Sequence, residues 1–219
     1  MSLRNFVHSY KEIKEPQTFQ LPLINPRDSN SISFTLETFD GSDYSFDIGG
    51  GDVKTRPSIP QPISETLDAS TGTNTTFYLK RSNVKTLRLL SKSYDFNSEI
   101  LYGFSNLKAL QLRDEVDLDI LRIPQSVNDF VFVADGAVVN GYNTRRNFTY
   151  TTMRRFILNN TGGTGLTSGE VDDLLEDLSL ADWEGVKTVT IAGVHSARTS
   201  ASDSFVTTLQ GKGVTVTTN

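Results

Sequence analysis

The residues best suited to chemistry are four aspartates, Asp40, Asp43, Asp47 and Asp52, which lie close together in the sequence. Ca²⁺ binds several oxygen ligands at once, so a run of carboxylates is one way to hold it. The spacing does not match an EF-hand loop, and alternation along a strand would place these carboxylates on opposite faces. We therefore favour turn-forming and solvated aspartates, with a Ca²⁺ site as the alternative.

Other candidate sites each lack a part that their chemistry requires. Residues 162–165, Gly-Gly-Thr-Gly, precede an expected helix, where backbone N–H groups could receive a phosphate. The Lys and Ser/Thr that complete a P-loop do not follow them. His8 and His195 are isolated, the chain has no cysteine, and no Gly-x-Ser-x-Gly motif is present. We expect no catalytic residue, no metal and no cofactor, and hence a protein that is not an enzyme.

Aromatic and basic side chains in the connections are the remaining candidates. Tyr142 and Tyr150 fall between expected strands, and Arg145 and Arg146 lie between the two tyrosines. Aromatic residues and arginine are enriched at protein contact surfaces, so these four are our candidate binding residues. The alternative interpretation of the two arginines is solvated loop charge. Phe104, in a similar connection, is expected to pack in the core, because large aromatic side chains are usually mostly buried.

The elements that must position these residues follow a phrase that recurs five times, most clearly as Leu-Lys-Ala-Leu-Gln-Leu at residues 107–112. Apolar residues occupy its first, fourth and sixth positions, and the last two share one face of a short strand. One such strand cannot bury its own face, so the copies are predicted to stack side by side as a parallel sheet. The fourth positions, separated by 23, 20, 26 and 33 residues, are Leu87, Leu110, Phe130, Phe156 and Val189.

The first three separations fit the leucine-rich repeat range of roughly 20 to 29 residues. We therefore predict an α+β or mainly β fold, in which a small N-terminal antiparallel β unit precedes an irregular leucine-rich-repeat-like solenoid with a parallel sheet. The residues expected in its core are Leu110, Leu112, Phe130, Phe156, Leu158, Val189 and Ile191. The repeat template also expects asparagine at its ninth position. The residues found there are Lys92, Glu115, Asp135, Thr161 and Val194, so the stack is expected to be irregular.

Local signals define the outer elements. Apolar residues alternate at positions 32, 34 and 36 and again at 44, 46 and 48, around the turn residues Asp40 and Gly41, which predicts an antiparallel hairpin. A capping box at Thr167 and Glu170 opens a helix, and Ser200 opens a second one. We divide the chain into an N-terminal arm (1–16), a small antiparallel β unit (17–65), a linker (66–74) and the leucine-rich-repeat-like solenoid (75–219).

Composition limits the partners. The chain has 219 residues and a net charge of −5, which provides no electrostatic footprint for nucleic acid. No stretch approaches the ~20 apolar residues that span a bilayer, so no membrane insertion is expected. The polar start of the chain lacks the apolar core of a signal peptide, so we expect no export.

Two resemblances follow from longer stretches. Residues 166–175, 192–193, 197–203 and 209–216 are similar to the closing segment of leucine-rich-repeat-like domains in tailed-phage virion proteins, the tail and appendage proteins. The alternating strand that ends in Gly-Gly-Gly-Asp at residues 49–52, followed by the repeats, also resembles irregular leucine-rich-repeat bacterial surface proteins.

The first resemblance implies a non-enzymatic phage virion structural protein, a capsid- or tail-associated appendage that contacts the host surface. The implied partners are other virion subunits and a host-surface glycan or protein. We also expect a homo-oligomer with contacts mainly in residues 1–65, because a small three-stranded sheet needs a cover for its apolar face. The second resemblance implies the alternative, a bacterial cell-surface leucine-rich-repeat binding or adhesion protein. An enzyme acting on polysaccharide is the third class, and no recognisable site supports it.

Overall fold

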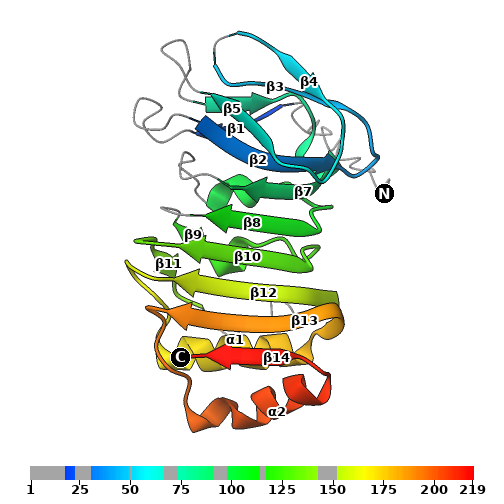
Figure 1. Cartoon of the computed structure of the whole chain (residues 1–219). Coiled ribbons are helices and arrows are strands. Elements are labelled where there is room, and N and C mark those ends of the chain that lie inside the picture. Colours follow the sequence, from blue (N-terminus) through cyan, green and yellow to red (C-terminus); the bar gives the residue numbers. More distant parts are fainter. Residues whose placement is uncertain are drawn as a thin grey trace, which may run out of the picture.

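The largest sheet has eight strands in the order β14-β13-β12-β10-β8-β7-β2-β5 (Figure 1). The structure is a computed structural model that describes residues 18–22, 31–49, 51–66, 74–90, 98–113, 117–142 and 152–219. The strands of the large sheet are β2 (Ser31–Thr38), β5 (Ile63–Thr66), β7 (Val84–Leu89), β8 (Ala109–Arg113), β10 (Asp129–Ala134), β12 (Thr152–Asn160), β13 (Asp182–Gly193) and β14 (Thr215–Thr218). The strands from β7 to β14 pair in parallel, whereas β2 is antiparallel to both β7 and β5.

The buried face of this sheet is built from the recurring phrase. Its fourth positions lie side by side on five adjacent parallel strands, in the register Leu87, Leu110, Phe130, Phe156 and Val189. All five side chains are at most 1% exposed, and the sixth-position residues are buried beside them. The predicted core, Leu110, Leu112, Phe130, Phe156, Leu158, Val189 and Ile191, is confirmed.

A second sheet packs against the β2 end of the first. Its strands, in the order β1-β6-β3-β4, are β1 (Phe19–Pro22), β6 (Asn74–Phe77), β3 (Tyr44–Asp47) and β4 (Lys54–Arg56). Phe34 of β2 meets Phe46 and Phe77 of this sheet edge to face, with ring centroids 5.1 and 5.2 Å apart. The two sheets therefore share one aromatic core.

Short elements and helices complete the described fold. A two-stranded sheet pairs β9 (Leu118–Asp119) with β11 (Val139–Asn140). Single 3₁₀ turns occur at η1 (Arg81–Asn83), η2 (Ser98–Leu101), η3 (Ile120–Arg122) and η4 (Ser200–Ser202). The α-helices are α1 (Ser168–Leu180) and α2 (Asp203–Gly211). Figure 1 shows α1 behind β13 and β14, and α2 beyond the edge strand β14.

The second helix, expected to open at Ser200, begins at Asp203 after the 3₁₀ turn η4, whereas the first helix begins where the sequence places it. The Thr167 hydroxyl accepts the N–H of Glu170 at 3.4 Å, and the Glu170 carboxylate accepts the N–H of Thr167 at 2.8 Å. This reciprocal pair is the predicted capping box, and it satisfies two N–H groups that the first turn leaves without partners.

The predicted fold class is wrong. The described part of the chain is mostly β, with 45% in strands, three sheets, two α-helices and no closed barrel, and a leucine-rich-repeat-like solenoid is not shown. The antiparallel strands β2 and β5 belong to the same sheet as the parallel strands, so the antiparallel strands are not confined to a separate N-terminal unit. The strand β7 would otherwise be the open edge of the parallel strands. The strand β2 pairs with that edge because Leu36 lies beside Leu87 and continues the row of buried side chains.

The predicted hairpin is also wrong. The strands β2 and β3 do not pair, because β2 uses its two edges for β5 and β7 while β3 pairs with β4 and β6. The turn after Asp40 instead carries the chain from one sheet to the other, so that the apolar faces of the two strands meet.

The domain boundaries at 1–16, 17–65, 66–74 and 75–219 stay a prediction. Strand pairing crosses the expected linker, since β6 pairs with β1 and β3. Residues 1–16 lie outside the described residues.

Candidate binding site

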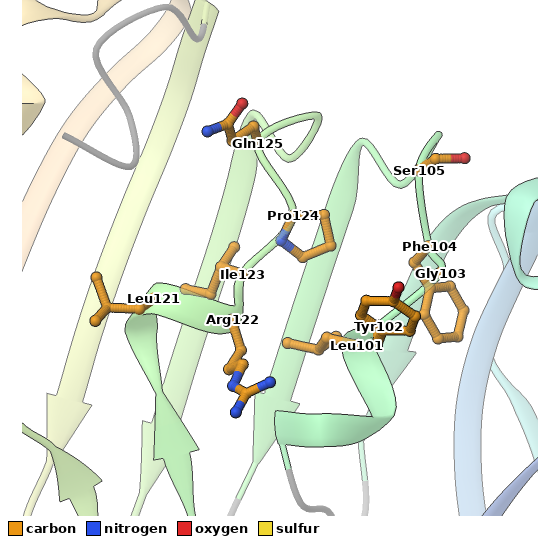
Figure 2. Close-up of a pocket in the computed structure, with 10 residues that line it drawn as sticks. All are labelled: Leu101, Tyr102, Gly103, Phe104, Ser105, Leu121, Arg122, Ile123, Pro124 and Gln125. Atoms are coloured by element: carbon orange, nitrogen blue, oxygen red, sulfur yellow. The ribbon is translucent and has the colours of Figure 1, made fainter. Parts of the chain in front are cut away.

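A depression of about 370 Å³ lies between the connection that leads into β8 and the connection that leads into β10. Figure 2 shows the two connections facing each other, Leu101 to Ser105 on one and Leu121 to Gln125 on the other. They become neighbours because β8 and β10 are adjacent parallel strands in register.

Tyr102 stands at one wall of the depression. Its N–H donates to the carbonyl oxygen of Glu99 at 3.2 Å, and its carbonyl accepts from Nη1 of Arg81 at 2.9 Å. Gly103 follows with φ +92, a left-handed conformation that suits glycine. Phe104 is 1% exposed, which confirms its predicted packing role, and its buried side chain anchors the turn that carries Tyr102. The Tyr102 side chain is 81% exposed although its backbone is held in place.

Arg122 stands on the opposite connection, at the end of η3. Asp119 caps this turn by accepting the N–H of Leu121 at 3.0 Å, and the same carboxylate lies 3.4 Å from Nε of Arg122. Ile120 and Ile123 are buried on either side of Arg122, so the backbone of the turn is fixed. The Arg122 side chain is 50% exposed and keeps its guanidinium in contact with solvent.

The lining combines apolar surface with hydrogen-bonding groups. Leu101, Ile123 and Pro124 contribute apolar atoms, and Ser105 and Gln125 contribute exposed polar side chains. Among the lining residues that the structure describes, the one charged side chain is that of Arg122, and none carries a carboxylate or an imidazole. This arrangement can bind a ligand, but it brings no general acid and base together.

The candidate binding residues from the sequence occupy a different place. Tyr142 is 2% exposed, its hydroxyl donates to the Asp177 carboxylate of α1, and its N–H donates to Oε1 of Glu170 at 3.1 Å. The side chain therefore fastens a connection onto α1. Arg145, Arg146 and Tyr150 lie outside the described residues, so their binding role stays a prediction.

The acidic run forms turns. Asp40 accepts from the Ser42 hydroxyl at 2.6 Å, from the Ser42 N–H at 3.0 Å and from Nδ2 of Asn83 at 3.1 Å. These bonds, those from Ser42 above all, lower the pKa of Asp40 to about 2. Asp47 accepts the N–H groups of Gly49 and Gly51. Within the described ranges no group of three or more acidic or histidine side chains gathers where it could hold a metal ion.

The glycine run at 162–165 is packed against backbone. A Cβ on Gly163 would collide with the carbonyl oxygen of Ala137, and one on Gly165 would lie 2.7 Å from the carbonyl oxygen of Val194. His195 is buried beside this run, and its Nδ1 accepts the N–H of Leu166 at 3.0 Å. Burial lowers the pKa of His195. The glycines thus allow close contact between neighbouring layers of the fold.

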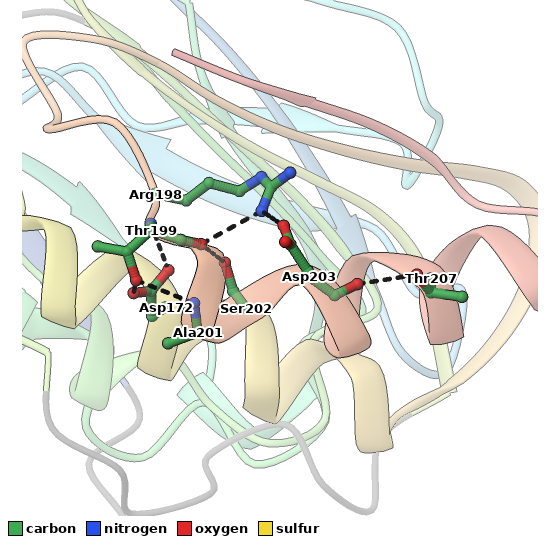
Figure 3. Close-up of polar contacts among 7 residues, drawn as sticks. All are labelled: Asp172, Arg198, Thr199, Ala201, Ser202, Asp203 and Thr207. Atoms are coloured by element: carbon green, nitrogen blue, oxygen red, sulfur yellow. Dashed lines mark hydrogen bonds and ion pairs between the residues drawn. The ribbon is translucent and has the colours of Figure 1, made fainter.

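A polar junction joins α1 to the start of α2 (Figure 3). The Asp172 carboxylate accepts the N–H of Thr199 at 3.0 Å and its hydroxyl at 2.5 Å, and Arg198 pairs with Asp203 at 2.5 Å. Burial raises the pKa of Asp172, but hydrogen bonds from Ser202 and Thr199 outweigh it and leave the pKa below its usual value. These groups bind the chain's own backbone and side chains, so the junction is structural.

Sequence reasoning missed Tyr102 and Arg122. Each is a polar or amphipathic residue set among buried apolar ones shortly before a strand of the recurring phrase. That pattern marks an exposed side chain on a well-anchored turn, and it recurs in two adjacent copies.

None of the helices in the described ranges has the length and apolar character needed to cross a membrane. Comparison of the chain with protein-family models, with curated proteins and with solved structures found no match.

Proposed function

We propose that this protein is a non-enzymatic structural component of a phage virion, associated with the capsid or tail, that contacts the host surface. The observation that carries the binding role is the depression between the β8 and β10 connections. Its described lining residues offer an exposed ring, a cation and polar groups, with no acid–base pair among them. Concave sites of this composition are typical of ligand binding. The virion setting is supported by the resemblance of residues 166–175, 192–193, 197–203 and 209–216 to closing segments of virion proteins.

Assembly with itself and with other virion subunits is part of the proposal. In the described part of residues 17–65, three large apolar side chains are well exposed, namely Phe39 (54%), Val53 (52%) and Ile59 (41%). The loop that holds Ile59 lies against the end of β2, because the Ser58 hydroxyl accepts the N–H of Thr38 at 2.8 Å. Apolar side chains that stand out from this end of the molecule suit a subunit contact.

The location can be tested on purified particles of a phage that encodes the chain. We expect mass spectrometry to find the protein in gradient-purified virions, and gold-labelled antibody to mark the capsid or the tail. Antibody that marks bacterial cells and leaves the virions unlabelled would refute the virion role and favour the alternative, a bacterial cell-surface binding protein. Release of oligosaccharides from host capsular glycans by the purified protein would refute the non-enzymatic assignment.

A further inference from the structure

We propose that the depression between the β8 and β10 connections binds a sugar that carries a carboxylate, such as a uronic acid within a surface glycan. The inference rests on the proposed function only for the source of this sugar, the host surface. The site itself is inferred from Tyr102, Arg122 and the other described residues that line the depression.

The aromatic wall suits a sugar ring. A tyrosine ring is a flat apolar surface with a polar tip, and Tyr102 presents it to solvent at 81% exposure. The carbonyl of Tyr102 is held by Arg81, whose guanidinium also lies 5.8 Å from the centre of the Phe104 ring. Because the N–H and the carbonyl of Tyr102 are both hydrogen-bonded, little backbone entropy is lost at this residue when a ligand covers the ring.

The charge of the lining selects an acidic sugar over a neutral one. Arg122 supplies the single charge among the lining residues in the described ranges, and guanidinium groups bind carboxylates through paired N–H donors. Its contact with Asp119 is made through Nε at 3.4 Å, which is longer than a good charge-assisted hydrogen bond. Asp119 also caps η3, so it orients Arg122.

The remaining groups match the other parts of a sugar. Ser105 and Gln125 are exposed at the edge of the depression, where a hydroxyl and an amide can exchange hydrogen bonds with sugar hydroxyls. Leu101 and Pro124 provide an apolar surface for the C–H groups of the sugar ring. A volume of about 370 Å³ lies at the small end of the range for ligand pockets, roughly 300 to 1,000 Å³. The site therefore holds one sugar unit of a longer glycan.

The test uses uronate tetrasaccharides of the gluco, galacto and manno series together with their methyl esters, which keep the sugars and remove the charge. Saturation-transfer NMR and titration calorimetry measure their binding to the full chain. We expect at least one acid to bind roughly tenfold or more tightly than its ester, because only the acid can pair with Arg122. Arg122→Gln should remove this preference, and Tyr102→Ala should weaken the acid and the ester alike.

Two exposed residues outside the depression provide matched controls. Arg113→Gln removes a cation, and Tyr78→Ala removes an exposed ring, and both should leave binding unchanged. Equal binding of acid and ester, or acid binding that survives Arg122→Gln, would overturn the proposed ligand class. Absence of binding to every tetrasaccharide would overturn the site, whereas the virion role would be judged separately by the particle analysis.

Discussion

Tyr142→Phe tests whether Tyr142 serves the fold or a ligand. The substitution removes one oxygen atom and keeps the ring, so the packing of the side chain is preserved. The lost hydrogen bond ends on the Asp177 carboxylate, which is 2% exposed, so water cannot readily replace the hydroxyl. A hydrogen bond to a charged group contributes about 1.5–3 kcal/mol.

The expected result is therefore a loss of about 1.5–3 kcal/mol in the free energy of unfolding. For a chain of this size a loss of 1 kcal/mol lowers Tm by about 2–4 °C, so Tm should fall by about 3–12 °C. Urea unfolding followed by circular dichroism measures the free energy, and the m-value should not change. Tyr102→Phe is the matched control, because that hydroxyl belongs to an exposed side chain and its loss should cost less than ~0.5 kcal/mol.

A double-mutant cycle with Asp177→Ala, which removes the accepting oxygens, isolates the contact itself. We expect the two substitutions to be clearly non-additive, since each removes the same bond. A cost for Tyr142→Phe no larger than that of the Tyr102→Phe control, together with additive behaviour, would refute the reasoning. Tyr142 would then return as a candidate binding residue.

Two further predictions concern the core and pH. Leu110→Ala, within the buried row, should lower the free energy of unfolding by about 2–5 kcal/mol in denaturant titrations, and a cost near zero would contradict the strand register. In the folded state, burial lowers the pKa of His195 below its ordinary value of 6.5. The unfolded chain therefore takes up the proton more readily than the folded chain. The contribution of His195 to stability should be complete above about pH 6.5 and decline as the pH falls toward the lowered folded pKa. In His195→Asn the amide oxygen can still accept the Leu166 N–H. Urea titrations should then show a smaller decrease in the free energy of unfolding between about pH 7 and pH 5 than in the unchanged protein. An equal decrease would exclude His195 as its source.

Local chemistry in the sequence determined the parallel strands and the first helix. Two apolar residues two positions apart, such as Leu110 and Leu112, define the buried face of a strand whatever its neighbours are. The capping box of Thr167 and Glu170 is likewise complete within four residues. These features could be predicted because each depends on side chains that are close in the sequence.

Strand partners and the site were decided by contacts between distant segments. Alternation shows which face of β2 is buried, but not whether its edge pairs with β3 or with β7, because the same alternation suits either partner. Tyr102 and Arg122 become neighbours only after β8 and β10 have paired. The burial of Tyr142 required α1 to pack over its connection. Partner choice follows from the total apolar surface that two segments bury together, and that quantity exists only in the assembled tertiary structure.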